Sequence, residues 1–521
     1  MNDHSPPAYD AIIVGAGHNG LVTSFYLARA GMKVLVLESR DIIGGAAVTE
    51  ELWPGHRVPT CSYLCHVLQA KVIEDMDLPA HGFSVHHLEP GYFAPFPDGS
   101  RILTWDDDDR TVAEISKISR HDAAAFPHYI ALRKRMASLI AAYFLKPAPS
   151  LAEMVEKVRH TEDEPLLERL LVGSMTDLLD EYFVDSRVKG WQVSALDAGD
   201  PSAPGSLLSA SYVAVGLLTP TRYHGIVSGG MGGITQAMAG ACRSMGVDLR
   251  INARVERILV ESEAAVGVRL ENGDELMARI IVSNADPKLT FLELVGKENL
   301  QASFVEAVER LKTKAAYLKF HAVASDLPDF SRYLGPGYDD HALAQIRICP
   351  SVEYYRQSWD DASHGRLSTC PVMSIQIPTV YDSTLVQGEG HVISIWVQYA
   401  PVKPANGHWN ELSCTAGEQL IDAVSEYVPD FRSKVTEWVL FTPDDIERRV
   451  GMTDGNIRHI DMVAGQLLNL RPMAGWSNYR TPVEGLYLCG AGTHPGGEVT
   501  GAPGHNAAYA ILKDRLRSVS S

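Results

Sequence analysis

The sequence predicts an α/β fold in which a discontinuous Rossmann-like domain carries an inserted α+β domain. Three observations lead to this prediction. An apolar strand near the N-terminus runs into a Gly-x-Gly-x-x-Gly turn, a second glycine-rich strand-to-helix turn lies near the C-terminus, and helical and strand-like segments fill the stretch between them.

The N-terminal elements follow the order strand, turn, helix, strand. Residues 11–14 are apolar, residues 21–30 suit a helix that Gly31 ends, and residues 33–37 form a second strand. This order is the setting in which a glycine triplet indicates dinucleotide binding.

Each glycine of the first turn has a separate role. Gly15 permits the tight turn, Gly17 lets the backbone approach a pyrophosphate, and Gly20 lets the helix pack on the strand. The helix N-terminus then offers free N–H groups and the positive end of its dipole to the phosphates. Glu38 follows the second strand, where an acid takes the ribose hydroxyls, and it would repel the 2′-phosphate of NADP.

A second glycine turn follows Glu38 directly. Gly44 and Gly45 lie close to the basic residue Arg40, which predicts a further approach of backbone to phosphate. An ordinary glycine turn is the alternative reading of this pair.

The C-terminal region contains the other half of the predicted site. A short apolar strand at 485–489 leads into a glycine-rich stretch from Gly490 to Gly504, and an Ala-rich helix follows at about 506–517. This is another strand-to-helix turn suited to the close approach of a ligand.

Together the two ends resemble the phytoene-desaturase-related FAD-dependent oxidoreductases, and within them the branch of pyridine nucleotide-disulphide oxidoreductase domain-containing protein 2. The resemblance covers nearly the whole chain. Further matching segments are Ser228–Gly233, Ser283–Lys288, Ile377–Asp382, Val397–Pro401 and Gly455–His459.

The resemblance implies an FAD-binding domain of the glutathione-reductase/amine-oxidase type. It places adenosine at the first turn and at Val255, and the isoalloxazine near the C-terminal loop, including Gly490, Val499 and Thr500. It also implies that the inserted region is the substrate domain.

Two positions depart from the family pattern. Glu498 replaces a usual glycine, and Arg458 replaces a usual aromatic residue. Because the matched loop lies beside the flavin in the family, we expect His494 and Glu498 to be the catalytic residues, with a loop-shaping role as the alternative. Arg458 and His459 are further candidates on the substrate side.

The domains are predicted as separated pieces of chain. Residues 1–75, 226–289 and 465–521 form the FAD-binding domain, and residues 76–225 and 290–464 form the substrate or cap domain.

Local patterns predict the elements inside these pieces. In the FAD-binding domain, a turn at Asn272-Gly273 joins an apolar run at 265–270 to another at 276–283. In the cap, the aspartates at 106–109 suit a helix start, and no metal site is expected there. Residues 391–399 alternate as a strand.

Composition limits the class of protein. A chain of 521 residues predicts roughly two or three domains. The net charge of −18 argues against a nucleic-acid partner, and seven cysteines fit a reducing, cytoplasmic compartment. The first residues lack the features of a secretory signal, and no apolar run reaches the ~18 residues of a membrane span.

The sequence therefore predicts an FAD-dependent dehydrogenase of an apolar small molecule, with oxygen or a quinone as electron acceptor. A flavin amine oxidase and a flavin-dependent isomerase are the alternatives among enzymes. A flavin-binding protein that acts through partners is the alternative outside enzymes. Disulphide exchange by Cys61 and Cys65 is disfavoured by their spacing. Residues 133–145 suit a buried or cavity-lining helix with a solvated basic end, and a patch that contacts a membrane surface is the alternative. A homo-oligomer is the alternative to a monomer.

Overall fold

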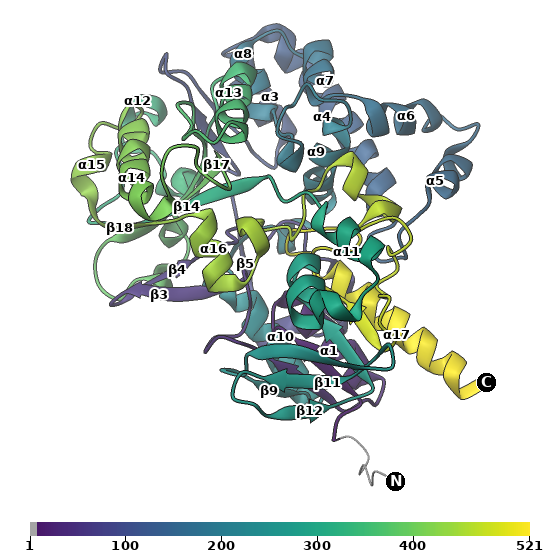
Figure 1. Ribbon diagram of the computed structural model, residues 1–521. Coiled ribbons are helices and arrows are strands. Elements are labelled where there is room, and N and C mark those ends of the chain that lie inside the picture. The colour runs from purple at the N-terminus through teal and green to yellow at the C-terminus, as the bar shows by residue number, and fades with distance from the viewer. Residues whose placement is uncertain (1–7, 521) are drawn as a thin grey trace, which may run out of the picture.

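A computed structural model describes residues 8–520 and places a nucleotide-binding layer below a larger cap (Figure 1). Residues 1–7 and residue 521 of the predicted FAD-binding domain lie outside the described residues, and so does the N-terminal stretch on which the expectation of no secretory signal rests. Within residues 8–520, no helix combines the length and the apolar character needed to cross a bilayer.

The core of the lower layer is a five-stranded parallel sheet. Its order is β19-β13-β1-β2-β9, so strands that are distant in sequence are neighbours in space. The bounds are β1 Ala11–Val14, β2 Val34–Leu37, β9 Asp248–Arg250, β13 Ile280–Ser283 and β19 Leu486–Leu488. All three predicted pieces of chain therefore contribute strands to one sheet, whereas the domain limits themselves stay a prediction.

Both faces of this sheet are covered, as its apolar strands require. Helices α1 (His18–Arg29), α10 (Gly232–Ser244) and α17 (Ala502–Ser520) share a hydrophobic core with one face. The other face packs on a three-stranded sheet and on a π-helical segment, Leu289–Gly296. The strands of that sheet are β10 Val255–Glu261, β11 Ala264–Leu270 and β12 Glu275–Met277.

The hairpin predicted at Asn272-Gly273 is present, because β11 and β12 pair in antiparallel fashion on either side of it. The second apolar run, however, is not one element. The apolar run at 276–283 is divided between β12, which pairs with β11, and β13, which pairs with β1. Ala278 and Arg279 connect the two, and a single apolar run cannot show that its halves join different sheets.

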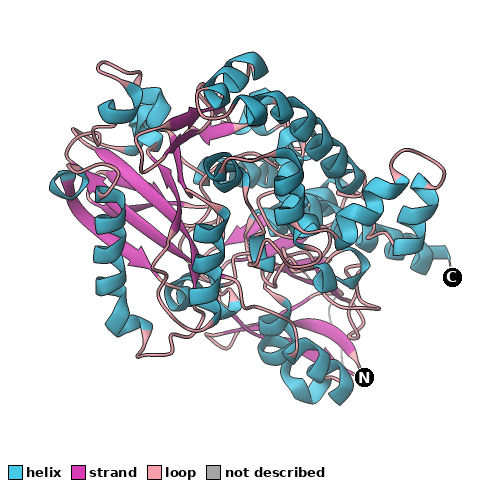
Figure 2. Cartoon of the chain, turned by 90° about the horizontal axis from the view of Figure 1, so that it is seen from above, coloured by secondary structure: helices cyan, strands magenta, loops and turns pink. Residues whose placement is uncertain are grey.

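The cap is built on a seven-stranded mixed sheet of order β18-β14-β17-β16-β15-β6-β7. The strands of this sheet are β6 Phe93–Pro95, β7 Arg101–Leu103, β14 Ala316–Ala324, β15 Gln345–Ile348, β16 Val372–Gln376, β17 His391–Ala400 and β18 Val435–Phe441. The predicted strand at 391–399 is thus β17, and the long strands lie side by side next to a group of helices (Figure 2).

The remaining elements pack around these sheets. In the cap they include α3 Asp108–Ser116, α4 Arg120–Ala141, α5 Leu151–Val158, α6 Glu164–Val172, α7 Met175–Tyr182, α8 Ser186–Gln192, α9 Ser206–Ala214, α12 Ser331–Leu334, α13 Val352–Ser363, α14 Trp409–Ser425, α15 Phe431–Lys434 and α16 Pro443–Val450. Helix α11 (Ala302–Glu309) instead packs on the π-helical segment of the lower layer. Shorter pieces are β3 Thr49–Trp53, β4 His56–Pro59, α2 Ala70–Asp75, β5 Val85–His87 and β8 Gly225–Val227.

Two helix starts are worth comparing with their predictions. Asp107 caps α3, as predicted, because its carboxylate accepts the amide hydrogens of Asp109 and Arg110. Helix α17 begins at Ala502, four residues before the predicted start.

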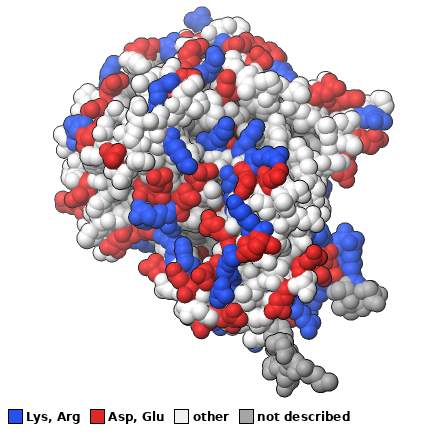
Figure 3. Space-filling view, in the orientation of Figure 1, with Lys and Arg blue, Asp and Glu red and all other residues white. Residues whose placement is uncertain are grey.

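Acidic and basic side chains are intermixed over the visible face of the molecule (Figure 3).

Candidate active site

The first glycine turn connects β1 to α1 at the carboxyl end of β1, the central strand of the parallel sheet. Gly15 has φ +95°, a region that favours glycine. A Cβ on Gly20 would lie 2.3 Å from the Gly15 carbonyl oxygen, and a Cβ on Gly17 would lie 2.7 Å from Asn284 Nδ2. Gly15 and Gly20 therefore cannot take a side chain without backbone strain or a clash, and the turn leaves the N-terminus of α1 open to an anion.

Glu38 ends β2 beside this turn and is 6% exposed. Its Oε2 accepts the Ala16 amide at 2.9 Å, and its Oε1 accepts the Arg40 amide at 3.0 Å. These bonds fix the carboxylate at the turn, where the sequence places a ribose-binding acid.

The second glycine turn touches the first. Gly17 and Gly44 form a β-bridge, and a Cβ on Gly45 would lie 3.1 Å from the Cα of Gly17. Gly44 and Gly45 have φ +139° and +59°. The two turns thus form a narrow trough of bare backbone, which suits a diphosphate.

Arg40 lines the same cavity but has a protein partner. Its guanidinium binds Glu50, which also accepts Arg449 Nη2 at 2.8 Å. Burial raises the pKa of Glu50, but Thr60 and the two arginines lower it further, so the group stays ionised. Arg40 Nη1 is buried and has no hydrogen-bond partner, so one donor of this side chain is still free.

A single cavity of about 1310 Å³ joins these turns to the cap. Its lining includes Glu38, Val255, Glu498 and Val499 from the nucleotide layer and Trp191 from the cap. Pockets for one drug-sized ligand measure roughly 300–1,000 Å³. This cavity is large enough for a dinucleotide together with a second molecule.

The C-terminal loop approaches the first turn closely. A Cβ on Gly490 would lie 2.7 Å from the backbone carbonyl oxygen of Asn284. A Cβ on Gly504 would lie 2.2 Å from the backbone carbonyl oxygen of Asn19. Thr500 Oγ1 accepts the Ala502 amide at 3.1 Å where α17 begins. Gly490 and Thr500 therefore shape the loop, whereas Val499 and Glu498 reach the cavity.

Arg458 connects Glu498 to the cap through buried contacts. Its Nε and Nη2 donate to Glu498 Oε1 at 2.9 and 2.6 Å. Its Nη1 donates to Asp197 Oδ1 at 2.9 Å and to Tyr317 Oη at 2.8 Å. Burial alone would lower the pKa of Arg458, but its acidic neighbours raise it well above the ordinary value.

Glu498 remains ionised in this network. Burial raises the pKa of its carboxyl group, but Arg458 and His66 lower it further, to below the ordinary value. Its Oε2 makes no hydrogen bond to another described residue. One oxygen is therefore held by Arg458, and the other is free to contact a ligand.

The structure separates the two predicted catalytic residues. His494 is 1% exposed, and its Nε2 lies 2.9 Å from the Tyr143 carbonyl oxygen. Burial lowers the pKa of His494 to about 4, and its side chain is not part of the cavity lining. His459 does line the cavity, and burial lowers its pKa to about 3.

Asp197 and Tyr317 are functional candidates that sequence reasoning missed. Asp197 is 261 positions from Arg458, and its Oδ2 accepts the Met462 amide at 2.7 Å. No motif surrounds either residue in the sequence. Asn284, which packs against Gly15 and Gly17, lies in a segment that the resemblance had already matched.

The cysteines do not form a redox pair. Among the described residues all seven thiols are free. Burial raises the pKa of Cys61 to about 11 and that of Cys65 to about 12, so neither is a thiolate near neutral pH.

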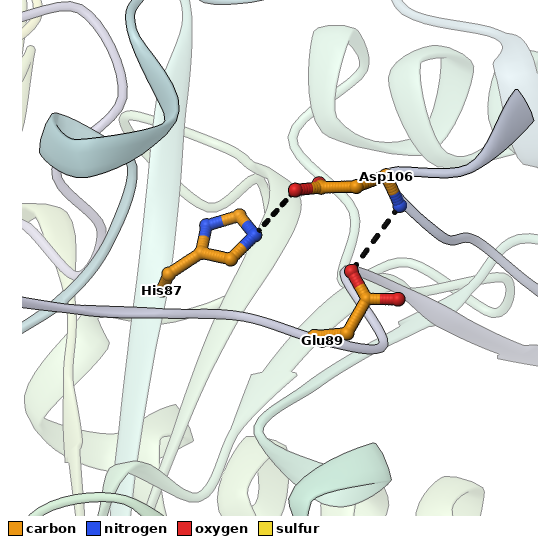
Figure 4. A group of neighbouring side chains, drawn as sticks. All are labelled: His87, Glu89 and Asp106. Carbon is orange, nitrogen blue, oxygen red and sulfur yellow. Dashed lines mark hydrogen bonds and ion pairs between the residues drawn. The ribbon is translucent and has the colours of Figure 1, made fainter.

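His87, Glu89 and Asp106 form a polar trio (Figure 4). His87 and Asp106 line the same cavity. His87 Nε2 and Asp106 Oδ2 are 2.8 Å apart, and the Asp106 amide donates to Glu89 Oε2 at 3.2 Å. One ligand atom from each residue lies within 4.8 Å of the others. These mutual bonds account for the arrangement, and the expectation of no metal stays a prediction.

The fold and the cavity define the Rossmann-like dinucleotide-binding class, and the relatives identify it as a flavin-type oxidoreductase. A family profile described as an NAD(P)-binding Rossmann-like domain matches residues 13–76. Pyridine nucleotide-disulfide oxidoreductase domain-containing protein 2 of Mus musculus is 34% identical over 98% of this chain and 95% of its own. The chain belongs to the family of that protein.

More distant relatives extend the same class. A neurosporene-forming phytoene desaturase of Rhodobacter capsulatus is 25% identical over 96% of this chain and 93% of its own length. A solved structure of putrescine oxidase, a triple mutant from a redesign of cofactor binding, superposes with a TM-score of 0.64. The superposition covers 98% of this chain and 99% of the putrescine oxidase chain, and the two sequences are 16% identical. The two proteins therefore share a fold.

Proposed function

We propose that the protein binds FAD and dehydrogenates a largely apolar small molecule. The observation that carries the proposal is the single cavity of about 1310 Å³ that joins the glycine trough to the cap. An oxidoreductase needs its cofactor and substrate in contact, and a shared cavity provides that contact.

The lining residues support FAD as the dinucleotide. Glu38 and Val255 suit the adenosine, and the trough between Gly17 and Gly45 suits the diphosphate. Val499 lies in the loop where the isoalloxazine is expected. The carboxylate of Glu38 disfavours a 2′-phosphate, which argues against NADP.

The cap side supports an apolar substrate. Phe126, Ile130, Trp191, Val213 and Leu217 contribute apolar surface to the cavity. Such surface binds hydrocarbon groups by the hydrophobic effect. The name of the phytoene desaturase relative points to a hydrocarbon of the same character.

The chemistry divides between the cofactor and one side chain. When bound, FAD supplies a two-electron acceptor for a hydride from the substrate. The substrate loses its second hydrogen as a proton, and Oε2 of Glu498 is the candidate acceptor for it. Arg458 keeps the carboxylate ionised and holds its other oxygen in place. Oxygen or a quinone is the proposed final electron acceptor.

Anaerobic mixing tests this function. The FAD-loaded protein is mixed with apolar alkenes, alcohols and amines, and the absorbance of the oxidised flavin is followed. We expect bleaching by at least one apolar compound. A protein that retains FAD, but that no compound of a broad apolar panel bleaches, would contradict the dehydrogenase and favour a flavin-binding protein.

Glu498→Gln tests the proton acceptor. We expect the rate of flavin bleaching to fall by about 100-fold or more, because a positioned base contributes about 10²–10⁴-fold. FAD content should stay unchanged. Glu275→Gln, at an exposed position in β12, is the matched control. Equal rates for both variants would show that Glu498 has a structural role.

A further inference from the structure

A polar strip crosses the cavity-facing side of the large cap sheet. Arg347 of β15 lies directly opposite Ser374 of β16, and Ser374 lies directly opposite Trp396 of β17. Gln398 is two residues beyond Trp396 and therefore shares its face. All four residues line the cavity.

Arg347 carries a positive charge without an acidic partner. Its Nη2 donates to the Val193 carbonyl oxygen at 2.6 Å, and its Nε is buried with no partner. Across the described part of the chain, no carboxylate forms an ion pair with it. Arg458, in the same cavity, is neutralised by Asp197 and Glu498.

The neighbours of Arg347 add unused polar groups. The Ser374 hydroxyl and the Gln398 amide, 6% and 3% exposed as residues, form no side-chain hydrogen bond to another residue that the structure describes. Trp396 Nε1 is buried and also lacks an acceptor. Buried donors without acceptors are costly, so this wall is suited to a ligand that accepts hydrogen bonds.

A second arginine in the cavity differs from Arg347. Arg133 is 7% exposed, and its Nη1 and Nη2 lie 3.1 Å from Met175 Sδ and the Ala210 carbonyl oxygen. Its Nε is also buried without a partner, but the contacts of both terminal nitrogens hold its guanidinium in the packed helical wall. Arg347 is less buried and is flanked by polar groups that have no partners.

We propose that Arg347, with Ser374 and Gln398, binds the carboxylate of a substrate that is otherwise apolar. This inference rests on the proposed function, because it takes the cap side of the cavity as the substrate site. The Arg347 guanidinium can pair with one carboxylate, whose two oxygens can accept from it and from its polar neighbours. The apolar helical surface takes the rest of the molecule.

Calorimetric titration of the FAD-loaded protein tests the site with three probes of equal chain length. These are dodecanoate, dodecanol and dodecyl phosphate, each below its micelle concentration. We expect dodecanoate to bind about tenfold or more tightly than dodecanol, because a charge-assisted hydrogen bond to a carboxylate adds affinity. Arg347→Gln should remove this preference and leave dodecanol binding unchanged.

Two further variants control the experiment. Arg347→Lys keeps the charge and should keep part of the preference for dodecanoate. Arg356→Gln removes an exposed arginine that does not line the cavity, and it should change nothing. Equal affinities for dodecanoate and dodecanol, or a preference that survives Arg347→Gln, would overturn the proposal. Tighter binding of dodecyl phosphate than of dodecanoate would overturn the assignment of a carboxylate.

The experiments distinguish a failure of the proposed dehydrogenase from a failure of the proposed carboxylate site. If no apolar compound bleaches the flavin, while dodecanoate still binds in a manner that depends on Arg347, the dehydrogenase is wrong and the anion site stands. If an uncharged compound is oxidised, and Arg347→Gln changes neither its binding nor that of dodecanoate, the dehydrogenase stands and the anion site is wrong.

Discussion

Buried charges within the cavity wall are the main feature at the scale of single residues. Arg458 and Asp197 have side chains that are 3% and 0% exposed, and Glu498 is also largely buried. Removal of one of these three side chains leaves the remaining charges in the protein interior, which solvates ions poorly. This network therefore makes both stability and ligand binding depend on Arg458.

Arg458→Met should destabilise the fold by about 3–5 kcal/mol, because Asp197 and Glu498 lose their counter-charge. The free energy of unfolding is measured with urea. Arg432→Met is the control, since Arg432 forms exposed ion pairs with Glu418 and Asp422 that contribute about 0–1 kcal/mol. Equal losses for the two variants would contradict the buried network.

Lys319 gives a prediction of pH dependence. It is 2% exposed, and its Nζ lies 3.1 Å from Ser394 Oγ. Burial lowers its pKa from 10.5 to about 7. Between these two values the unfolded chain binds more protons at this site than the folded chain does, so this residue makes stability rise with pH, and below about 7 its full penalty is present.

Lys319→Met should therefore stabilise the protein most below about pH 7. The gain over wild type should shrink by about 1.4 kcal/mol for each pH unit above that value, because the wild type recovers stability there. Urea unfolding at about pH 6.5 and about pH 9 measures the difference. Lys297→Met, at an exposed lysine, should show no such slope, and a constant gain for Lys319→Met would refute the pKa shift.

At the scale of elements, the two glycine turns show what local sequence could predict. The order of strand, glycine triplet, helix, strand and acid identified β1, α1, β2 and Glu38, because each feature is local. The division of residues 276–283 and the partners of Arg458 could not be predicted, because both depend on contacts between distant segments.

Gly45→Ala tests the trough between the turns. The new methyl group would lie 3.1 Å from Gly17 Cα, where a diphosphate would pass, so we expect FAD affinity to fall by about tenfold or more. Gly31→Ala is the matched control, because Gly31 has φ +82° but nothing lies within 4 Å of its added Cβ. Both variants should lose similar stability from backbone strain, roughly 1–2 kcal/mol, and only Gly45→Ala should lose FAD.

If FAD affinity stays the same in Gly45→Ala, the second turn does not contact the cofactor. Equal losses of FAD in both variants would mean that backbone strain, rather than obstruction of the trough, explains the effect. Flavin fluorescence during titration of the cofactor-free protein gives both affinities.

At the scale of the whole molecule, three separate pieces of chain build one nucleotide layer beneath the cap (Figure 1). The two ends of the sequence supply the turns, and the middle supplies β9 and β13. The cap then encloses the cavity from above with a polar sheet wall and an apolar helical wall. A sequence could predict the two layers, but not which cap residues face the cavity, because those residues come together only through sheet register and helix packing.

The identity and amount of nucleotide released from the purified protein test this account most directly. The protein is denatured, and the released compound is identified by mass and quantified against the chain. We predict about one FAD per chain, in keeping with one glycine trough beside Glu38. Release of NAD or NADP instead, or a chain that takes up no FAD when the cofactor is added, would contradict the account.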